Sequence, residues 1–380
     1  MSRILIVGQS YITAESRKKL THLASHHLDV ALIVPTTWEH DSFGSYTFQP
    51  TPQDARISIY AIPVRNNGRV FAFSYALAPL WRAMQKIQPD IFHIEQEPGS
   101  LSLLQFVVLR RLRPRAKLLA FTWENLFYRP SQPRQFLEQI ELAELDYLFA
   151  GSSGAAQVFR QKGYRGPLQV LPNIGIDPRH FAPHPADKLR RTLGLTERFV
   201  IGYVGRLVPE KGCADLLNAF AQLPENCHLL FVGSGALRDE IVRRAAERGI
   251  ETRVTFQPTV PHDRVADFLN VMDCLVLPSR TMPKWREQFG LVLAQAMACG
   301  VPVIGSDSGA IPEVIADAGL IFPEGDVAAL RETLIRLRND ATLRAELSAR
   351  GRERVLAHYT HERIAEQTYA IYHQLLAEEV

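Results

Sequence analysis

Short apolar runs recur along the first half of the chain, and helical patterns separate most of them. Helical spacing is clear at residues 80–88 and 136–144, each between two such runs. Strands that are apolar on both faces and alternate with helices predict a parallel sheet covered by helices on both sides. The strands predicted for this sheet are residues 4–8, 30–34, 57–62, 91–94, 118–122, 147–151 and 168–171.

A second series of the same kind follows a proline-rich stretch at residues 172–197, where we expect the domain boundary. Helices are expected at 214–222 and 237–248. A long helical tail is expected from Val327 to the end of the chain, with an interruption near residues 358–360. The pattern predicts two doubly wound α/β domains in tandem, with ligands beyond the carboxyl ends of the strands. The strands of the second series are residues 199–204, 227–232, 254–256, 274–277, 303–304 and 320–322.

Composition narrows the class of protein. The 380 residues are 46% hydrophobic with a formal net charge of +3, which excludes a disordered chain and disfavours a nucleic-acid binder. Residues 1–180 hold 20 Lys+Arg and 14 Asp+Glu, whereas the remainder holds 23 and 26, so the two domains should meet different partners. The four cysteines lack CxxC spacing and no signal-like segment is visible, which predicts free thiols and a cytoplasmic protein.

The densest chemical signal lies where the second series begins. The first strand of that series runs into Gly205, and two cations, Arg206 and Lys211, follow just before a helix. Glycine lets a ligand approach the backbone, and cations at a helix entry suit a diphosphate. A solvated surface pair is the alternative. A strand also enters a helix through the turn of Gly233 and Gly235, which suits a nucleotide but equally an ordinary tight turn.

A third segment joins an acid, a glycine and a buried helix. Glu287 precedes a helix that should begin near Phe289, so the N–H groups of Phe289, Gly290 and Leu291 would point at an anion. Gln295 lies eight residues beyond Glu287, roughly 12 Å along a helix. That reach suits one ligand with a sugar at one end, a diphosphate on the helix, and a ribose at the other end.

These motifs, in this order, resemble glycosyltransferase family 4, the retaining enzymes of the glycosyl transferases group 1 type with a GT-B fold. The resemblance is strong over about residues 168–373 and weaker before that. It implies two Rossmann-like domains facing each other across a cleft, with a C-terminal helix crossing back to the first domain. The expected domains are an acceptor-binding domain, residues 1–178 plus about 362–380, and a donor-binding domain, residues 179–361. The matching segments include residues 172–181, 205–212, 233–235, 287–290, 297–302 and 306–313.

Site roles follow from the resemblance. Arg206 and Lys211 would bind the diphosphate of a nucleotide sugar, and Glu287 would hydrogen-bond the transferred sugar as a catalytic residue. Gln295 stands where the family usually has a second Glu for the ribose; it keeps an acceptor oxygen but loses the charge. The remaining members of the expected donor site are Gly205, Gly233, Gly235, Phe289, Gly290 and Leu291.

The first domain departs from the family pattern. The turn after the first strand keeps one glycine, Gly8, followed by Tyr11, and the usual His of a later strand end is missing. Trp123, Glu124 or Asn125 would take the place of that His. We therefore add Trp123 and Glu124 to the catalytic candidates and Asn125 to the acceptor candidates, with capping and packing as the alternative.

Alternating polar residues follow another strand of the first domain. His93, Glu95 and Glu97 would share one face at its carboxyl end, which favours acceptor binding over a metal site. The chain has no Asp-x-Asp, and the resemblance also implies a metal-independent enzyme without a cofactor, in which cations neutralise the leaving diphosphate.

Two basic clusters account for much of the positive charge of the first domain. Basic residues beside apolar ones are typical of contact with an anionic membrane, and cations at a solvated helix end are the alternative. We expect peripheral contact at the inner face of the membrane. The cluster residues are Arg17, Lys18, Lys19, Arg110, Arg111, Arg113 and Arg115.

The sequence thus predicts a hexosyltransferase that moves a sugar from a nucleoside-diphosphate donor to a glycan or lipid-linked acceptor, as in cell-envelope polysaccharide biosynthesis. Two alternatives stay open. One is a non-catalytic nucleotide-sugar-binding subunit, suggested by Gln295 and the missing His. The other is a GT-B nucleotide-sugar epimerase.

Overall fold

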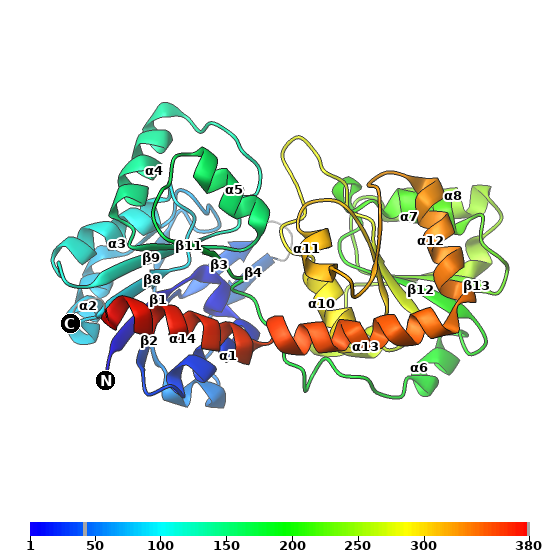
Figure 1. Ribbon diagram of the computed structural model, residues 1–380, viewed down its shortest axis with the longest axis horizontal. Coiled ribbons are helices and arrows are strands. Elements are labelled where there is room, and N and C mark those ends of the chain that lie inside the picture. The colour runs from blue at the N-terminus through cyan, green and yellow to red at the C-terminus, as the bar shows by residue number, and fades with distance from the viewer. Residues whose placement is uncertain (41–43, 378–380) are drawn as a thin grey trace. The chain divides into compact units, whose positions relative to one another are not determined.

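The computed structural model describes residues 1–40 and 44–377, and the chain divides into two compact units. The first unit comprises Met1–Gly175 and the C-terminal segment from His361, and the second comprises Ile176–Thr360. The sequence predicts divisions after residue 178 and after residue 361, close to those of the structure. Each unit has its own parallel sheet, as Figure 1 shows.

The first unit is built on a seven-stranded parallel sheet in the order β11-β10-β9-β8-β1-β2-β5. Its central strands are buried on both faces, as the continuous apolar runs predict. The strands are β1 (Arg3–Val7), β2 (Asp29–Pro35), β5 (Ser58–Ile62), β8 (Ile91–Ile94), β9 (Lys117–Thr122), β10 (Tyr147–Ala150) and β11 (Leu168–Val170).

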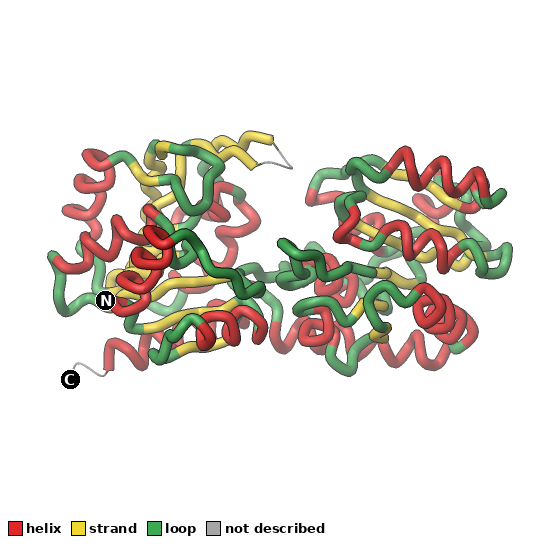
Figure 2. The backbone as a smooth tube through the Cα atoms, turned by 90° about the horizontal axis from the view of Figure 1, so that it is seen from above, coloured by secondary structure: helices red, strands yellow, loops and turns green. Residues whose placement is uncertain are grey.

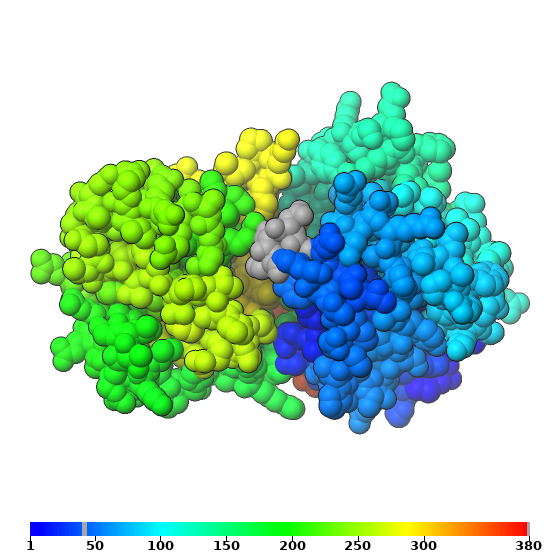
Figure 3. Space-filling model, turned by 180° about the vertical axis from the view of Figure 1, so that it is seen from behind, coloured from blue at the N-terminus to red at the C-terminus, as the bar shows by residue number. Residues whose placement is uncertain are grey.

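Helices lie on both sides of this sheet, as the tube view in Figure 2 shows. The helix α14 (His361–Ala377) returns to the first unit and packs against α1 (Ala14–Ala24). The predicted crossing back of the last helix is therefore confirmed. The helix α4 (Gln132–Glu144) lies at the surface, where it is teal in Figure 3. The others are α2 (Leu77–Ile87), α3 (Leu101–Arg111) and α5 (Ser153–Gln161).

The second unit repeats the design with a six-stranded parallel sheet in the order β14-β13-β12-β15-β16-β17. Its strands are β12 (Phe199–Val204), β13 (Cys227–Val232), β14 (Val254–Gln257), β15 (Cys274–Leu277), β16 (Val303–Ser306) and β17 (Leu320–Phe322). Its helices are α6 (Asp187–Thr192), α7 (Cys213–Phe220), α8 (Arg238–Glu247), α9 (Val265–Leu269), α10 (Leu291–Ala298), α11 (Ile311–Ile315), α12 (Val327–Asn339) and α13 (Ala341–His358).

The structure differs from the predicted elements in three places. Two small antiparallel ladders, β3 (Thr37–His40) with β4 (Gly44–Thr47) and β6 (Val64–Arg65) with β7 (Ser74–Tyr75), are too short for a periodicity to reveal. The helical tail breaks at Asp340, whose carboxylate caps α13 by accepting from the N–H of Leu343.

The third difference is the start of α10, which begins at Leu291 and not near Phe289. Gly290 precedes it in the left-handed conformation with φ of 79°, which costs glycine nothing, and its carbonyl accepts from Leu293 N. The rest of the fold follows the alternation of strands and helices.

No described helix is both long and apolar enough to span a lipid bilayer. All four cysteines are buried free thiols.

Candidate functional site

The second unit gathers its polar groups at the carboxyl ends of β12, β13 and β15. The chain leaves β12 at Gly205, makes a short 3-10 turn over Pro209–Lys211 and enters α7 through Gly212. Gly212 has φ of 66°, and a Cβ there would lie only 1.8 Å from the carbonyl oxygen of Pro278. This close approach fixes Lys211 beside the end of β15.

The glycines after β12 and β13 pack against each other. A Cβ on Gly233 would lie 1.9 Å from the carbonyl oxygen of Gly205, and one on Gly235 would lie 2.3 Å from that of Leu207. The two loops also share a backbone hydrogen bond from Leu207 N to Ser234 O, 2.9 Å long. These glycines therefore have a packing role that needs no ligand, and their contact with a donor stays a prediction.

Lys211 and Glu287 meet although 76 residues separate them. The Lys211 ammonium donates to Glu287 Oε2 over 2.6 Å, and Ser279 Oγ donates to the same oxygen over 2.8 Å. Ser279 and Glu287 are buried, whereas the Lys211 side chain keeps 17% of its surface exposed. Lys211, which is predicted to bind the diphosphate, and Glu287, which is predicted to bind the sugar, therefore lie in one cluster.

Arg206 and α10 complete the candidate donor site. The Arg206 guanidinium lies 3.4 Å from Glu210 and keeps 35% of its side-chain surface exposed. Gln295 is buried on α10, one turn beyond Leu291, while Phe289 packs edge-on against Tyr359. These placements agree with a ligand that runs along the start of α10; the roles themselves stay predictions.

Sequence reasoning gave no role to two residues of this cluster. Ser279 follows a strand end, the position where polar residues of doubly wound sheets meet ligands, which was the available signal. Trp285 stands two residues before Glu287, and its ring lies under the Lys211 ammonium at 4.7 Å. Only the tertiary contact reveals its place.

In the first unit, a buried carboxylate collects side chains from three segments. Glu95 follows β8 and accepts from Tyr11 Oη at 2.6 Å, from Lys19 Nζ at 2.5 Å and from Asn173 Nδ2 at 2.8 Å. Burial alone would raise the pKa of Glu95, but the Lys19 ammonium and the neighbouring donors hold it below its usual value. Gly8 belongs to this cluster, since a Cβ there would lie 3.4 Å from Glu95 Cβ.

His93 is buried on β8 and fastens the returning helix. Its Nδ1 lies 2.6 Å from the Tyr372 hydroxyl of α14, and its Nε2 lies 3.9 Å from Glu95. Burial lowers the pKa of His93 to about 4, so the ring is neutral at physiological pH. Tyr11, His93 and Glu95 therefore hold the loop after β1 and the helix α14 in place. Their contact with an acceptor stays a prediction.

Glu97 does not join His93 and Glu95. Its carboxylate accepts from Thr122 Oγ1 at 2.6 Å and from Trp123 N at 2.7 Å, which ties β8 to the end of β9. Burial raises the pKa of Glu97 to about 7. The predicted acceptor residues therefore fall into two clusters, one around Glu95 and one that begins at Glu97.

The second cluster continues through Glu124. Its carboxylate lies 2.5 Å from Lys162 Nζ, which also donates to Glu138 at 2.6 Å. The carboxylate of Glu141, on the same helix as Glu138, accepts from Gly99 N, and burial raises its pKa to about 8. Trp123 packs over Gly151, where a Cβ would lie 2.1 Å from the indole ring. Asn125 is buried beside them.

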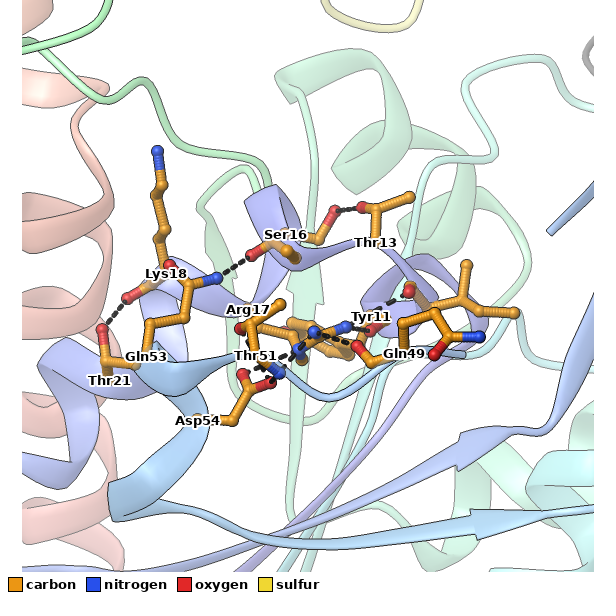
Figure 4. A network of polar contacts seen from close by, with 12 residues as sticks. Tyr11, Thr13, Ser16, Arg17, Lys18, Thr21, Gln49, Thr51, Gln53 and Asp54 are labelled. Carbon is orange, nitrogen blue, oxygen red and sulfur yellow. Dashed lines mark hydrogen bonds and ion pairs between the residues drawn. The ribbon is translucent and has the colours of Figure 1, made fainter. Parts of the chain in front are cut away.

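The first basic cluster is not a membrane surface. Arg17 is fully buried and forms a fork with Asp54, with Nε–Oδ1 and Nη2–Oδ2 distances of 2.8 and 3.0 Å (Figure 4). Its other N–H groups donate to the carbonyl oxygens of Tyr11 and Gln49, among others. Lys19 is buried against Glu95, as described above. The prediction that Arg17 and Lys19 meet a membrane is therefore wrong, because both charges are used inside the fold.

The other five cations are at the surface, but three of them are paired with acids. Lys18 extends away from the Arg17 network in Figure 4 and pairs with Glu15 at 2.7 Å. Arg110 and Arg111 reach Asp146 and Glu144 at 3.4 and 2.5 Å. The remaining two are Arg113, which is half-buried, and Arg115, which is exposed.

The described part of the chain holds no cluster of three or more His, Cys, Asp or Glu side chains that would suit a metal ion. Metal-independent chemistry stays a prediction, because a donor can bring its own ion. In the second unit Lys211 and Arg206 supply positive charge where a diphosphate is expected.

Comparison with known proteins agrees with this geometry. Residues 186–354 match the family model described as Glycosyl transferases group 1. A GDP-mannose-dependent monoacylated alpha-(1-6)-phosphatidylinositol monomannoside mannosyltransferase from Corynebacterium glutamicum is 34% identical over 245 residues, 62% of this chain and 63% of that protein. N-acetyl-alpha-D-glucosaminyl L-malate synthase from Bacillus anthracis is 32% identical over 217 residues, 56% of this chain and 55% of that protein. The matched regions thus span about half to two thirds of these relatives.

Solved structures resemble the chain over nearly its whole length. HepE from Anabaena in complex with UDP has a TM-score of 0.76 at 20% identity, covering 98% of this chain and all of the other. Sucrose-phosphate synthase from Thermosynechococcus elongatus has a TM-score of 0.74 at 23% identity, covering both chains completely. The fold is therefore GT-B, with two Rossmann-like domains, as the sequence predicts. Within it, residues 186–354 of the second unit are similar to the glycosyl transferases group 1 family.

Proposed function

We propose that the protein is a retaining hexosyltransferase, which transfers a sugar from a nucleoside-diphosphate donor to a glycan or lipid-linked acceptor. The second unit binds the donor and the first selects the acceptor. The observation that carries the proposal is the Lys211–Glu287–Ser279 cluster at the carboxyl edge of the second sheet, within the family-matched residues. The matched relatives named above are a mannosyltransferase and an N-acetyl-alpha-D-glucosaminyl L-malate synthase, which supports sugar transfer as the reaction class.

In this proposal the residues of the donor site divide the work. Arg206 and Lys211 neutralise the diphosphate as it leaves, which stabilises charge that develops in the transition state. Glu287 orients the sugar through its hydroxyl groups. Gln295, buried on α10, accepts from a ribose hydroxyl and donates through its amide. Because these cations supply the positive charge, the reaction needs no metal ion, and EDTA should leave transfer unchanged.

The first unit would receive the acceptor around Trp123 and Glu124, next to Asn125. In this proposal Glu124 exchanges a proton with an acceptor hydroxyl, and burial raises the pKa of its carboxyl group above the usual value. Lys162 holds that carboxylate in position and also pairs with Glu138. Glu124→Gln keeps the shape and removes the titration, so a lower and flatter pH–rate profile is the expected result.

Contact with an anionic membrane is the finer part of the proposal and now rests on Arg113 and Arg115. Arg113 and Arg115 line a pocket of about 580 Å³. Leu112, Pro89 and Pro114 also line it. Cations beside apolar side chains suit an anionic headgroup at the cytoplasmic face. Arg113→Ser with Arg115→Ser should reduce co-sedimentation with vesicles that contain phosphatidylglycerol. Unchanged sedimentation would remove membrane contact from the proposal.

The decisive experiment for the function has two steps. A thermal-shift screen across UDP-, GDP- and ADP-sugars identifies the donor, because a bound ligand stabilises the fold in proportion to ln(1+[L]/Kd). Transfer to candidate acceptors is then measured with that donor. Stabilisation without transfer or hydrolysis would indicate a non-catalytic binding subunit, and a new sugar nucleotide formed without acceptor would indicate an epimerase. No stabilisation by any donor would contradict the proposal.

A further inference from the structure

Trp285 is the only tryptophan of the second unit, because the other three are Trp38, Trp81 and Trp123. It is half-buried, and the Lys211 ammonium lies 4.7 Å from the centre of its ring. An ammonium over an indole face is attracted by the ring quadrupole, and indole is the strongest of the natural aromatic partners. The same ammonium donates to Glu287 on its other contact. Lys211 is thus held between a carboxylate and an aromatic face.

A short, well-anchored hairpin presents this ring. Met282 and Trp285 exchange two backbone hydrogen bonds, Met282 N to Trp285 O at 2.8 Å and Trp285 N to Met282 O at 3.2 Å. They close a tight turn whose first central residue is Pro283, the position that proline favours. The turn fixes the backbone from which the indole projects toward Lys211.

The base of the hairpin is fastened to neighbouring loops. The Arg280 guanidinium forms a bidentate pair with Asp215 on α7, and Arg280 N donates to Glu210 O at 2.8 Å. Thr281 N donates to Glu324 Oε2 at 2.6 Å. Because Glu210 immediately precedes Lys211, the hairpin and the turn that carries Lys211 form one connected unit.

We infer that Trp285 is a positioning residue for Lys211, holding the ammonium over the place where the donor diphosphate binds. Lysine has a flexible four-carbon stem, and fixing it when phosphate arrives costs rotamer entropy. A ring that already restricts the ammonium lowers that cost before binding. The inference deepens the proposed function and rests on it, since it needs Lys211 to bind a diphosphate. Neither Trp285 nor its hairpin follows from the motif residues alone.

The test compares Trp285→Leu with Trp285→Phe, and uses Trp81→Leu on α2 of the first unit as a matched control. Dissociation constants for UDP, GDP and ADP are measured by calorimetry. We expect Trp285→Leu to weaken the binding of whichever nucleotide binds by about 2- to 30-fold, the range of a cation–π contact. Trp285→Phe should recover most of the affinity, and Trp81→Leu should match the wild type.

A double-mutant cycle separates positioning from a general structural effect. In a Lys211→Met background, Trp285→Leu should weaken nucleotide binding by less than about twofold, because the ammonium that the ring holds is gone. In the absence of nucleotide, Lys211→Met should also change the emission of Trp285, obtained as the difference between proteins with and without Trp285→Phe. Equal losses in both backgrounds would overturn the inference.

Two further outcomes keep the inference apart from the proposed function. If Trp285→Leu alters the preference among UDP, GDP and ADP while Lys211→Met does not, the ring contacts the base and the inference is wrong, although the donor site stands. If the wild type binds none of the three nucleotides but Lys211→Met changes the Trp285 emission, the contact between Lys211 and Trp285 is real and the proposed function is wrong. The inference that Trp285 positions Lys211 for a diphosphate is then wrong as well.

Discussion

The carboxyl edges of the two sheets both carry charged residues, but the two units use the charges differently. In the first unit, Lys19 and Glu95 are almost fully buried and satisfy each other. In the second, Lys211 pairs with the buried Glu287 yet keeps 17% of its side chain exposed, and Arg206 keeps 35%. A buried pair that loses one partner leaves an uncompensated charge, whereas a pair in contact with solvent can exchange a partner for a ligand. The same edge of the fold is thus a scaffold in one unit and a candidate binding surface in the other.

The comparison also shows why residue type alone misleads. Arg17, Lys18 and Lys19 are consecutive cations on α1, but successive residues of a helix point about 100° apart. Arg17 and Lys19 enter the interior, and Lys18 lies at the surface. A cluster of like charges in the sequence therefore becomes two internal clamps and one surface ion pair.

The largest expected effect is a loss of stability in the first unit, where buried charges support the fold. Arg17→Met removes the ion pair of the buried Asp54 carboxylate, which keeps only its hydrogen bonds from Thr51. It also takes the Arg17 donor away from the carbonyl groups of Tyr11, Ile12 and Gln49. We expect the free energy of unfolding to fall by about 3–5 kcal/mol, the cost of breaking a buried ion pair. Urea unfolding measures it. Lys18→Met, one residue away, should cost less than about 1 kcal/mol. Equal losses in the two variants would show that the burial of Arg17 does not matter.

The next largest effect is expected on donor kinetics, at the candidate binding surface of the second unit. Lys211→Met should lower kcat/KM for the donor by about 10- to 150-fold, the value of a hydrogen bond to a charged group. Stability should also fall, but by less than in Arg17→Met, because the ammonium is partly solvated and the buried Glu287 keeps its hydrogen bond from Ser279. Lys284→Met removes an exposed lysine of the same loop and provides the control for net charge. Donor kinetics that are the same in both variants would remove Lys211 from the donor site.

The two halves also differ in how far the sequence could predict them. The contact between Lys211 and Glu287 was predictable because both belong to ordered motifs at strand ends, and their role in donor binding stays a prediction. The sheets were predictable because their strands are apolar on both faces, so that the alternation with helices stands out. The start of α10 was placed two residues early, since a glycine in the left-handed conformation ends an extended segment without any change in hydrophobicity.

The first unit was harder because its polar network depends on tertiary contacts. Glu95 meets Lys19 and Asn173 across 76 and 78 residues, and no local spacing marks such partners. His93, Glu95 and Glu97 alternate in the sequence, yet β8 ends at Ile94, so the strand geometry that would keep them on one face stops too early. The aromatic contact of Trp285 with Lys211 was hidden for the same reason.

A smaller effect is expected on the pH dependence of stability, through a buried acid of the first unit. Burial raises the pKa of Glu141 to about 8, above its ordinary value in the unfolded chain. The fold therefore favours the protonated acid, and this contribution is complete below about pH 4.5 and is lost as the pH rises through 8. Glu141→Gln keeps an acceptor for Gly99 N without titrating. At pH 8 it should be more stable than wild type by about 1–3 kcal/mol.

Urea unfolding at pH 5 and pH 8 measures this difference, which should nearly vanish at pH 5. Glu144→Gln, on the same helix but at the surface beside Arg111, is the matched control and should shift the unfolding midpoint little at either pH. A wild type whose stability is constant between pH 5 and 8 would mean that Glu141 is ionised in the fold. The polar groups of the first unit would then be more accessible to water than the comparison between the two units states.

The smallest effect tests the one departure from the family pattern in the ligand-facing half. Gln295→Glu restores the usual acid on α10, where a carboxylate accepts a stronger, charge-assisted hydrogen bond from a ribose hydroxyl. Nucleoside-diphosphate affinity should rise by about 2- to 5-fold, because the glutamine already offers one acceptor oxygen. Calorimetry with the wild type and the variant decides the sign. A loss of affinity would mean that the amide N–H groups of Gln295 are used in the wild type, so that this pocket has been rebuilt around a neutral residue.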